Sequence, residues 1–293
     1  MSTPAIAASH SAVRDFVELT KPRITLMVVL TALVGFLMAS PAGLRPGSLV
    51  ACLVGTALVA AGASSLNMLL ERRTDALMQR TRDRPLPSGR LRPAEALSFG
   101  LAITILGLAI LGWFAGFLAG AVALATWVTY LLVYTPLKTR TSLNTLVGAV
   151  PGALPPVIGW SAASGSLDPG AGVLFAILFL WQVPHFLAIA WIYRDDYAQG
   201  GLHMLPVVDP DGRITGRQAV AHSLGLLVVS LTPTAAGMAG NLYLVGAAFL
   251  GLALTGISVA AAVERTPAAA RRLFLASLVY LPALLSLLVA DRR

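Results

Sequence analysis

Residues 48–75 read SLVACLVGTALVAAGASSLNMLLERRTD, an apolar run that ends in a charged stretch. A helix needs about 20 apolar residues to cross a hydrocarbon layer about 30 Å thick, and residues 48–70 supply them. Asn67, Glu71 and Asp75 follow one another at intervals of four, so on a helix they share one face and span about 12 Å. The stretch therefore predicts a transmembrane helix that presents three oxygen-bearing side chains where it leaves the membrane.

Apolar runs of the same kind recur along the whole chain. The sequence is 57% hydrophobic and 12% charged, with a mean hydropathy of +0.79, whereas soluble domains carry about 25% charged residues. We expect an all-α polytopic membrane protein with a single domain over residues 1–293. Its nine transmembrane helices are expected near residues 24–40, 48–70, 95–115, 117–135, 144–162, 172–192, 218–237, 241–262 and 271–289. Only Gly112, Gly116 and Gly120 separate the third run from the fourth, and one long helix there would leave eight spans.

The basic residues favour nine spans with the N-terminus inside. In that arrangement 18 of the 21 Lys and Arg fall on the cytoplasmic side, as the positive-inside rule expects. If the third and fourth runs were one helix, the basic residues after them would be distributed over both sides of the membrane. Residues 1–20 are then a cytoplasmic segment, in which we recognise no cleavable signal peptide. Because the basic residues lie in short segments between spans, the net charge of +8 indicates lipid and anionic substrate as partners, and no nucleic acid. The single cysteine, Cys52, excludes a disulfide framework.

Two long inside segments, residues 71–94 and 193–217, hold most of the unusual chemistry. Carboxylate and amide oxygens beside a diphosphate are ligands that Mg²⁺ accepts, so Asn67, Glu71 and Asp75 are candidate ligands. Asp195 and Asp196 form a second acidic site at an inside helix end, and since neighbours on a helix point about 100° apart, only one of them is expected to face a shared cavity. The alternative for each acidic site is an ordinary solvated helix end.

Basic residues accompany the first acidic site, and two more follow the fourth span; all are candidates for binding a diphosphate by charge-assisted hydrogen bonds. Taken one at a time, the arginines are better explained by membrane topology and attraction to anionic lipid, and only their combination with the acidic face favours a diphosphate site. The candidates are Arg72, Arg73, Arg80, Arg82, Arg84 and Arg90, followed by Lys138 and Arg140.

His185 lies within the sixth span, next to Pro184 and close to Gln182. An ionisable side chain at that depth is a functional candidate, but a neutral, hydrogen-bonded histidine explains it equally well. We interpret His10, His203 and His222, whose spacing suits no metal site, as structural or surface residues.

Several motifs together resemble the UbiA-type intramembrane prenyltransferases, and within them the protoheme IX farnesyltransferases, or heme O synthases. The resemblance covers essentially the whole chain and differs from the family pattern at Glu71, where aspartate is usual, and at Thr139, where a basic residue is common. The motifs lie at residues 20–23, 67–78, 82–90, 134–138, 144–145, 155–160, 184–186, 195–197 and 204–206.

The resemblance implies a helical bundle around a cytoplasm-facing cavity in a bacterial inner membrane. It implies farnesyl diphosphate as the donor, heme b as the acceptor, and heme A synthase or oxidase assembly proteins as partners. Mg²⁺ is the implied cofactor, held through the diphosphate by Asn67, Glu71, Asp75 and Asp195, with Asp196 as a further catalytic residue. His185 and Tyr197 are the implied acceptor-binding residues.

Two alternatives remain at this stage. The first is a prenyltransferase whose acceptor is an aromatic or quinone precursor. The second is a membrane transporter, which would concentrate polar groups in broken helices near the middle of the bilayer.

Overall fold

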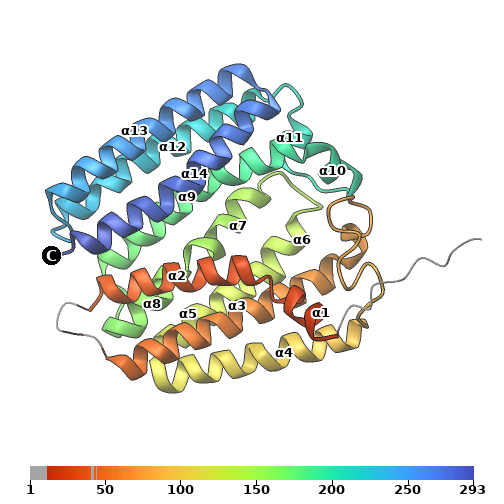
Figure 1. Cartoon of the computed structure of the whole chain (residues 1–293), viewed down its shortest axis with the longest axis horizontal. Coiled ribbons are helices and arrows are strands. Elements are labelled where there is room, and N and C mark those ends of the chain that lie inside the picture. Colours follow the sequence, from red (N-terminus) through yellow and green to blue (C-terminus); the bar gives the residue numbers. More distant parts are fainter. Residues whose placement is uncertain (1–11, 41–42, 44) are drawn as a thin grey trace, which may run out of the picture.

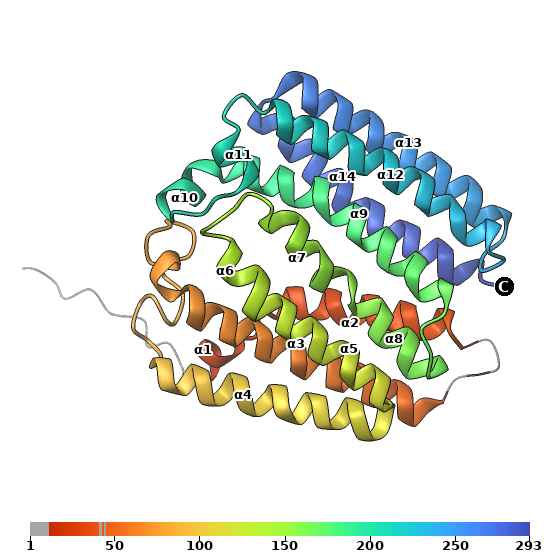
Figure 2. The same cartoon turned by 180° about the vertical axis from the view of Figure 1, so that it is seen from behind.

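The computed structural model describes residues 12–40, 43 and 45–293, and the elements within these ranges are helices (Figures 1 and 2). Their only β pairing is one isolated bridge between Ala239 and Arg292. Our predictions for residues 1–11, including His10, lie outside the described residues. The all-α prediction is confirmed.

Eight helical segments of the described residues are long and apolar enough to cross a membrane. They are α3 (Pro46–Asp75), α4 (Pro93–Ile110) with η1 (Leu111–Ala115), α5 (Phe117–Val128) with η2 (Thr129–Tyr134) and α6 (Thr135–Leu137), α7 (Asn144–Ala153) with α8 (Pro155–Ser164), α9 (Pro169–Ile192), α12 (Arg213–Ala235), α13 (Asn241–Glu264) and α14 (Pro267–Ala290).

A ninth candidate is the pair of α1 (Ala12–Leu19) and α2 (Pro22–Met38), which bend by 44° relative to each other and pass the same test only together. The described residues therefore hold eight candidate spans, or nine if this bent pair counts as one, where nine were predicted with the first near residues 24–40. The third and fourth runs are separate helices because Gly116 adopts a φ of 120°, which breaks the chain between η1 and α5. Most boundaries differ from the prediction by a few residues. The largest differences are that α3 ends at Asp75, where residue 70 was predicted, and that α12 begins at Arg213, where residue 218 was predicted, because both helices continue from apolar into charged sequence.

Small residues bring neighbouring spans into backbone contact. A methyl group added at Gly35 of α2 would lie 1.9 Å from the carbonyl oxygen of Pro156 in α8, and one added at Gly159 would lie 1.8 Å from that of Ala32. No side chain fits between α2 and α8 at these points. Close approach through glycine and alanine is the usual way in which membrane helices gain packing energy without a hydrophobic driving force.

The charged connections gather at one end of the molecule, which we call the charged end: residues 71–92, 138–143, 193–217 and 264–272. Figure 1 shows α10 (Arg194–Gln199) and α11 (Leu205–Val208) there, beside the turns that follow α3, whereas the C-terminus lies at the opposite end. Segments more than 100 residues apart in sequence therefore meet at the charged end, as the hydrogen bond from the Gln79 amide to Asp196 illustrates.

Candidate active site

The first acidic motif lies on one continuous helix, α3, whose last residue is Asp75. Asn67 is buried, and its side chain is held on both sides: Lys21 Nζ donates to its Oδ1 at 2.9 Å, and its Nδ2 donates to Thr135 Oγ1 at 3.2 Å. Asn67 thereby links the first span to α3 and to the start of α6. Its amide group is fixed in orientation before any ligand binds.

Glu71 forms the closest ion pair of the site. Lys138, one residue beyond α6, donates from Nζ to Glu71 Oε1 at 2.6 Å, and both side chains are largely buried. The ammonium group also lies over the ring of Tyr134, 4.5 Å from its centroid. Burial lowers the pKa of Lys138, whereas Tyr134 and the Glu71 carboxylate raise it, and the net effect is a pKa above the usual value. Lys138 is therefore a permanent cation beside the acidic face of α3.

Asp75 is paired with a residue of the turns that follow it. Arg84 Nη1 donates to Asp75 Oδ2 at 2.8 Å, and the Asp75 side chain is only 2% exposed. Thr81 Oγ1 donates to the backbone carbonyl of Asp75 at 2.8 Å. The turns therefore fold back onto the end of α3 and cover its last acid.

The second acidic motif contributes one of its two aspartates to this group. Asp196 Oδ1 accepts a hydrogen bond from the Gln79 amide at 2.7 Å, and Arg80 Nε lies 3.9 Å from Asp196 Oδ2. That Oδ2 atom is buried and has no hydrogen-bond partner among the described residues. Asp195, in contrast, has a side chain that is 90% exposed and lies 3.5 Å from Arg194. The structure therefore brings Asp196, and not Asp195, to the turns that follow the first motif.

The predicted acceptor residues lie in two different places. Tyr197 OH accepts a hydrogen bond from Arg80 Nη2 at 3.3 Å, so Tyr197 belongs to the same polar group as Asp196. His185 is buried within α9, where its Nδ1 lies 2.8 Å from Ser277 Oγ of α14 and its ring stacks on Trp181. His185 thus contacts α14 within the membrane-spanning part of the bundle.

Several predicted basic residues form no pair with Glu71, Asp75 or Asp196 among the described residues. Arg72 donates to the Leu69 carbonyl of its own helix at 2.8 Å. Arg82 is 61% exposed and lies 4.0 Å from Asp83, and Arg140 is exposed. Arg90 is bound to α1, with Nε 2.9 Å from Asp15 and Nη2 3.0 Å from Glu18.

Three contacts of the site were not predicted from the sequence. The contact of Lys21 with Asn67 was not predicted, because Lys21 was assigned no role beyond its place in the motif at residues 20–23. Its position directly before Pro22 and the first apolar run could have indicated a lysine at the charged end. Asn144 Nδ2 donates to the His203 carbonyl at 2.9 Å, and the His203 amide donates to the Lys138 carbonyl at 2.7 Å. Since the His203 contacts are made by its backbone, side-chain chemistry gave no indication of them.

Within the described ranges, no three His, Cys, Asp or Glu side chains are close enough to hold a metal ion by themselves. Each acid that faces the site instead has a basic neighbour: Lys138 for Glu71, Arg84 for Asp75, and Arg80 for Asp196. The arrangement is suited to a ligand that carries both signs of charge, because the acids can bind its cation and the bases its anion.

The model of the UbiA prenyltransferase family matches residues 28–281. The chain is 47% identical over 288 residues to a protoheme IX farnesyltransferase from Solibacter usitatus, covering 95% of this chain and 99% of that protein. It is 46% identical over 277 residues to the protein of the same name from Salinibacter ruber, covering 94% and 98%.

Solved structures share the fold at low sequence identity. A digeranylgeranylglyceryl phosphate synthase superposes with a TM-score of 0.81 at 16% identity, covering 95% of this chain and 98% of that chain. A UbiA homolog from Archaeoglobus fulgidus bound to GPP and Mg²⁺ superposes with a TM-score of 0.68 at 18% identity, covering 94% and 99%.

Proposed function

The chain belongs to the UbiA prenyltransferase family, and from this premise we propose that it transfers a farnesyl group from farnesyl diphosphate to a vinyl group of protoheme IX. The names of two relatives that are 47% and 46% identical support this donor and acceptor. The observation that carries the proposal is the set of paired acids and bases at the charged end. When a metal diphosphate binds, each acid can pair with the metal and each base with the diphosphate. No buried charge is then left unpaired, which would be costly.

The residues present fit a magnesium diphosphate. Asn67, Glu71, Asp75 and Asp196 offer oxygen atoms, and Asp196 Oδ2 is buried without a hydrogen-bond partner among the described residues. Because no three acids form a cage there, the diphosphate has to supply part of the coordination, which is how proteins commonly bind Mg²⁺. Asp195 lies outside this proposed set.

When bound, Mg²⁺ neutralises the charge that develops on a departing diphosphate. Lys138, Arg84 and Arg80 are positioned to take up the remaining negative charge once their own acids turn to the metal. Asn67 keeps its orientation through Lys21 and Thr135. Arg72, Arg82 and Arg140 pair with none of these acids among the described residues, and their proposed role is to attract the anionic substrate to this end of the molecule.

The proposed reaction breaks the bond between farnesyl C1 and the diphosphate oxygen, and the bond electrons leave with the diphosphate. The vinyl group of the heme attacks the allylic cation, water adds to the resulting heme-side cation, and that water releases a proton. The product carries a hydroxyethylfarnesyl side chain. Apolar side chains of the spans exclude water from the first cation, and His185 and Tyr197 are the proposed acceptor-side residues.

We place the charged end in the cytoplasm of a bacterial cell, in the inner membrane, because this end carries most of the basic residues. A product heme of this kind is a cofactor for terminal oxidases, so heme A synthase or oxidase assembly proteins are proposed partners.

The test is mass spectrometry of heme extracted after the purified protein is incubated with heme b, farnesyl diphosphate and Mg²⁺. We expect a hydroxyethylfarnesyl heme that disappears with EDTA and returns with added Mg²⁺. Glu71→Gln, which keeps the size of the side chain, is expected to reduce product at least about tenfold. Glu264→Gln is the matched control, since Glu264 is an exposed acid that pairs with Arg272 at 2.5 Å, outside the paired group.

Unchanged heme together with prenylation of a phenolic acceptor would refute the heme assignment and establish the aromatic alternative. Farnesyl diphosphate left intact with every acceptor by a protein of native helix content would refute prenyl transfer altogether.

A further inference from the structure

A groove runs along the outer surface between α12 and α13 and begins at the charged end. Arg213 and Arg217 line it from α12, one helical turn apart, and Arg265 lines it from the end of α13. Beyond the arginines its walls are apolar. They are formed by Val220, Ala221 and Leu224 of α12 and by Val259, Ala262 and Val263 of α13.

The arginines of this groove are exposed and largely without acidic partners. In residues 45–293, Arg213 and Arg217 form no ion pair, and Arg265 donates only to the Asp211 backbone carbonyl, at 3.3 Å. The nearest acid on α13, Glu264, is held by Arg272 with both carboxylate oxygens 2.5 Å from Nη2. The groove therefore has an uncompensated positive charge at one end.

The start of α12 does not add to this charge. The carboxylate of Asp209 accepts hydrogen bonds from the amide and the hydroxyl of Thr215, at 2.7 and 2.9 Å, and so caps the helix. The positive charge of the groove therefore comes from its three arginines, and an anion between Arg213, Arg217 and Arg265 offsets it.

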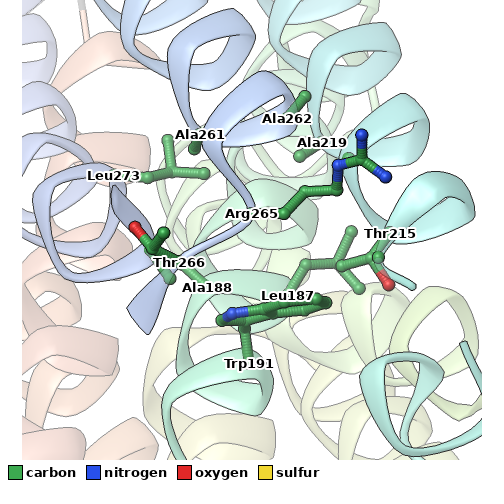
Figure 3. A pocket seen from close by; sticks show the side chains of 13 residues that line it. Leu187, Ala188, Trp191, Thr215, Ala219, Ala261, Ala262, Arg265, Thr266 and Leu273 are labelled. Atoms are coloured by element: carbon green, nitrogen blue, oxygen red, sulfur yellow. The ribbon is translucent and has the colours of Figure 1, made fainter. Parts of the chain in front are cut away.

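A small cavity lies on the inner side of the same helices, lined by Leu187 and Trp191 of α9 among others. Figure 3 shows Arg265 at the boundary of this cavity, with its guanidinium group directed away from Trp191. Arg265 lines both this cavity and the groove, but its guanidinium group does not point toward the indole of Trp191.

The dimensions of the groove match a lipid. From Arg213 to Leu224 the α12 wall is about 16 Å long, at about 1.5 Å per residue. Leu224, Val259 and Val263 are all substantially exposed along it. A basic head site followed by an exposed apolar wall of this length complements a phosphate with an acyl chain.

We propose that this groove binds one acidic phospholipid, with its phosphate between Arg213, Arg217 and Arg265 and an acyl chain along Leu224, Val259 and Val263. Membrane topology alone requires basic residues on this side but not their convergence on one apolar groove. The proposal does not depend on which acceptor the enzyme prenylates.

The first experiment is native mass spectrometry of the delipidated full chain with dioleoyl phosphatidylglycerol, or with dioleoyl phosphatidylethanolamine, which has the same chains and no net charge. We expect phosphatidylglycerol to bind in preference. The Arg213→Gln/Arg217→Gln variant should bind it about 30-fold more weakly. The control Arg23→Gln/Arg271→Gln removes the same charge elsewhere and should bind within about twofold of the parent.

Equal binding of the two lipids, or equal losses in the variant and the control, would overturn the proposal. Displacement of phosphatidylglycerol by soluble glycerol phosphate at equal concentration would overturn it as well, since the site would then recognise a free phosphate and not a lipid.

A second experiment locates the acyl chain. Val263 and Val245 lie on α13 and are 71% and 70% exposed, so a cysteine at either position can carry a benzophenone label, while the native Cys52 is buried. Photolysis should crosslink phosphatidylglycerol to position 263 and much less to position 245. Equal crosslinking at both positions would mean that the lipid is bulk solvent for α13, which contradicts the proposal.

Discussion

Arg84→Gln should destabilise the protein more than Asp75→Asn, although the two substitutions remove the same ion pair. The reason lies in the charge that each one leaves behind. Asp75 is 2% exposed and Arg84 is 24% exposed. Without Arg84, a buried carboxylate loses its cation at the C-terminal end of α3, where the helix dipole also disfavours negative charge. Without the Asp75 charge, the guanidinium of Arg84 can turn toward water.

The expected magnitudes follow from this burial. Breaking a buried pair by removing one partner costs about 3–5 kcal/mol when the remaining charge is uncompensated, which applies to Arg84→Gln. Losing a hydrogen bond to a charged group that can rehydrate costs about 1.5–3 kcal/mol, which applies to Asp75→Asn. We expect the double variant to be close to Asp75→Asn, because the buried charge is then absent.

The assay is equilibrium unfolding in mixed micelles of detergent and dodecyl sulfate, followed by tryptophan fluorescence at neutral pH without substrate. Equal losses for the two single variants, or a larger loss for Asp75→Asn, would refute the account of the pair. So would a double variant as unstable as Arg84→Gln.

Three further outcomes are expected. Asp196→Asn should lower product formation about 10- to 100-fold. Asp195→Asn, at a side chain that is 90% exposed, should change product formation less than about twofold. Similar losses in the two variants would contradict the assignment of Asp196. Arg90→Gln leaves the buried Asp15 without its partner and should cost about 3–5 kcal/mol in the same unfolding assay. An unaffected protein would show that α1 is held by other contacts. Gly35→Ala should lower the free energy of unfolding by about 1–3 kcal/mol, because the added methyl group meets the backbone of Pro156. The control Gly112→Ala, whose methyl group has nothing within 4 Å, should change it by less than about 0.5 kcal/mol. Equal effects would mean that α2 and α8 separate freely.

The spans were predictable because hydrophobic length is a strong and local signal in a membrane. The separation of the third and fourth spans at Gly116 was the weakest prediction, because only glycines lie between the two apolar runs. The distribution of basic residues predicted it correctly. The helix α1 and the bend after it were not predicted, because residues 1–20 are predicted as a cytoplasmic segment. The chain breaks between Leu19 and Pro22, where Lys21 has a φ of 47°. That residues 1–293 form a single domain stays a prediction.

The site was predictable only in part. The spacing of Asn67, Glu71 and Asp75 placed them on one face of a helix. Spacing could not decide which of Asp195 and Asp196 turns inward, since that depends on how α10 is seated against Gln79. The pairing of Glu71 with Lys138 joins residues 67 positions apart, and a single sequence carries no information on such a contact. Catalytic roles for all of these residues stay proposals.

Lys138 connects the two halves of the chain: its ammonium group binds Glu71, and its carbonyl accepts from the His203 amide. A membrane protein is synthesised from its N-terminus and inserts span by span. Glu71 and Lys138 are both available once the first four spans are in place, so a nascent chain can neutralise this acid early. Asp196 and His203 emerge from the ribosome some 60 residues after Lys138, so the group of charges that we assign to diphosphate binding stays incomplete until the sixth span has been made. A chain that has not yet made its sixth span therefore lacks part of the proposed diphosphate site.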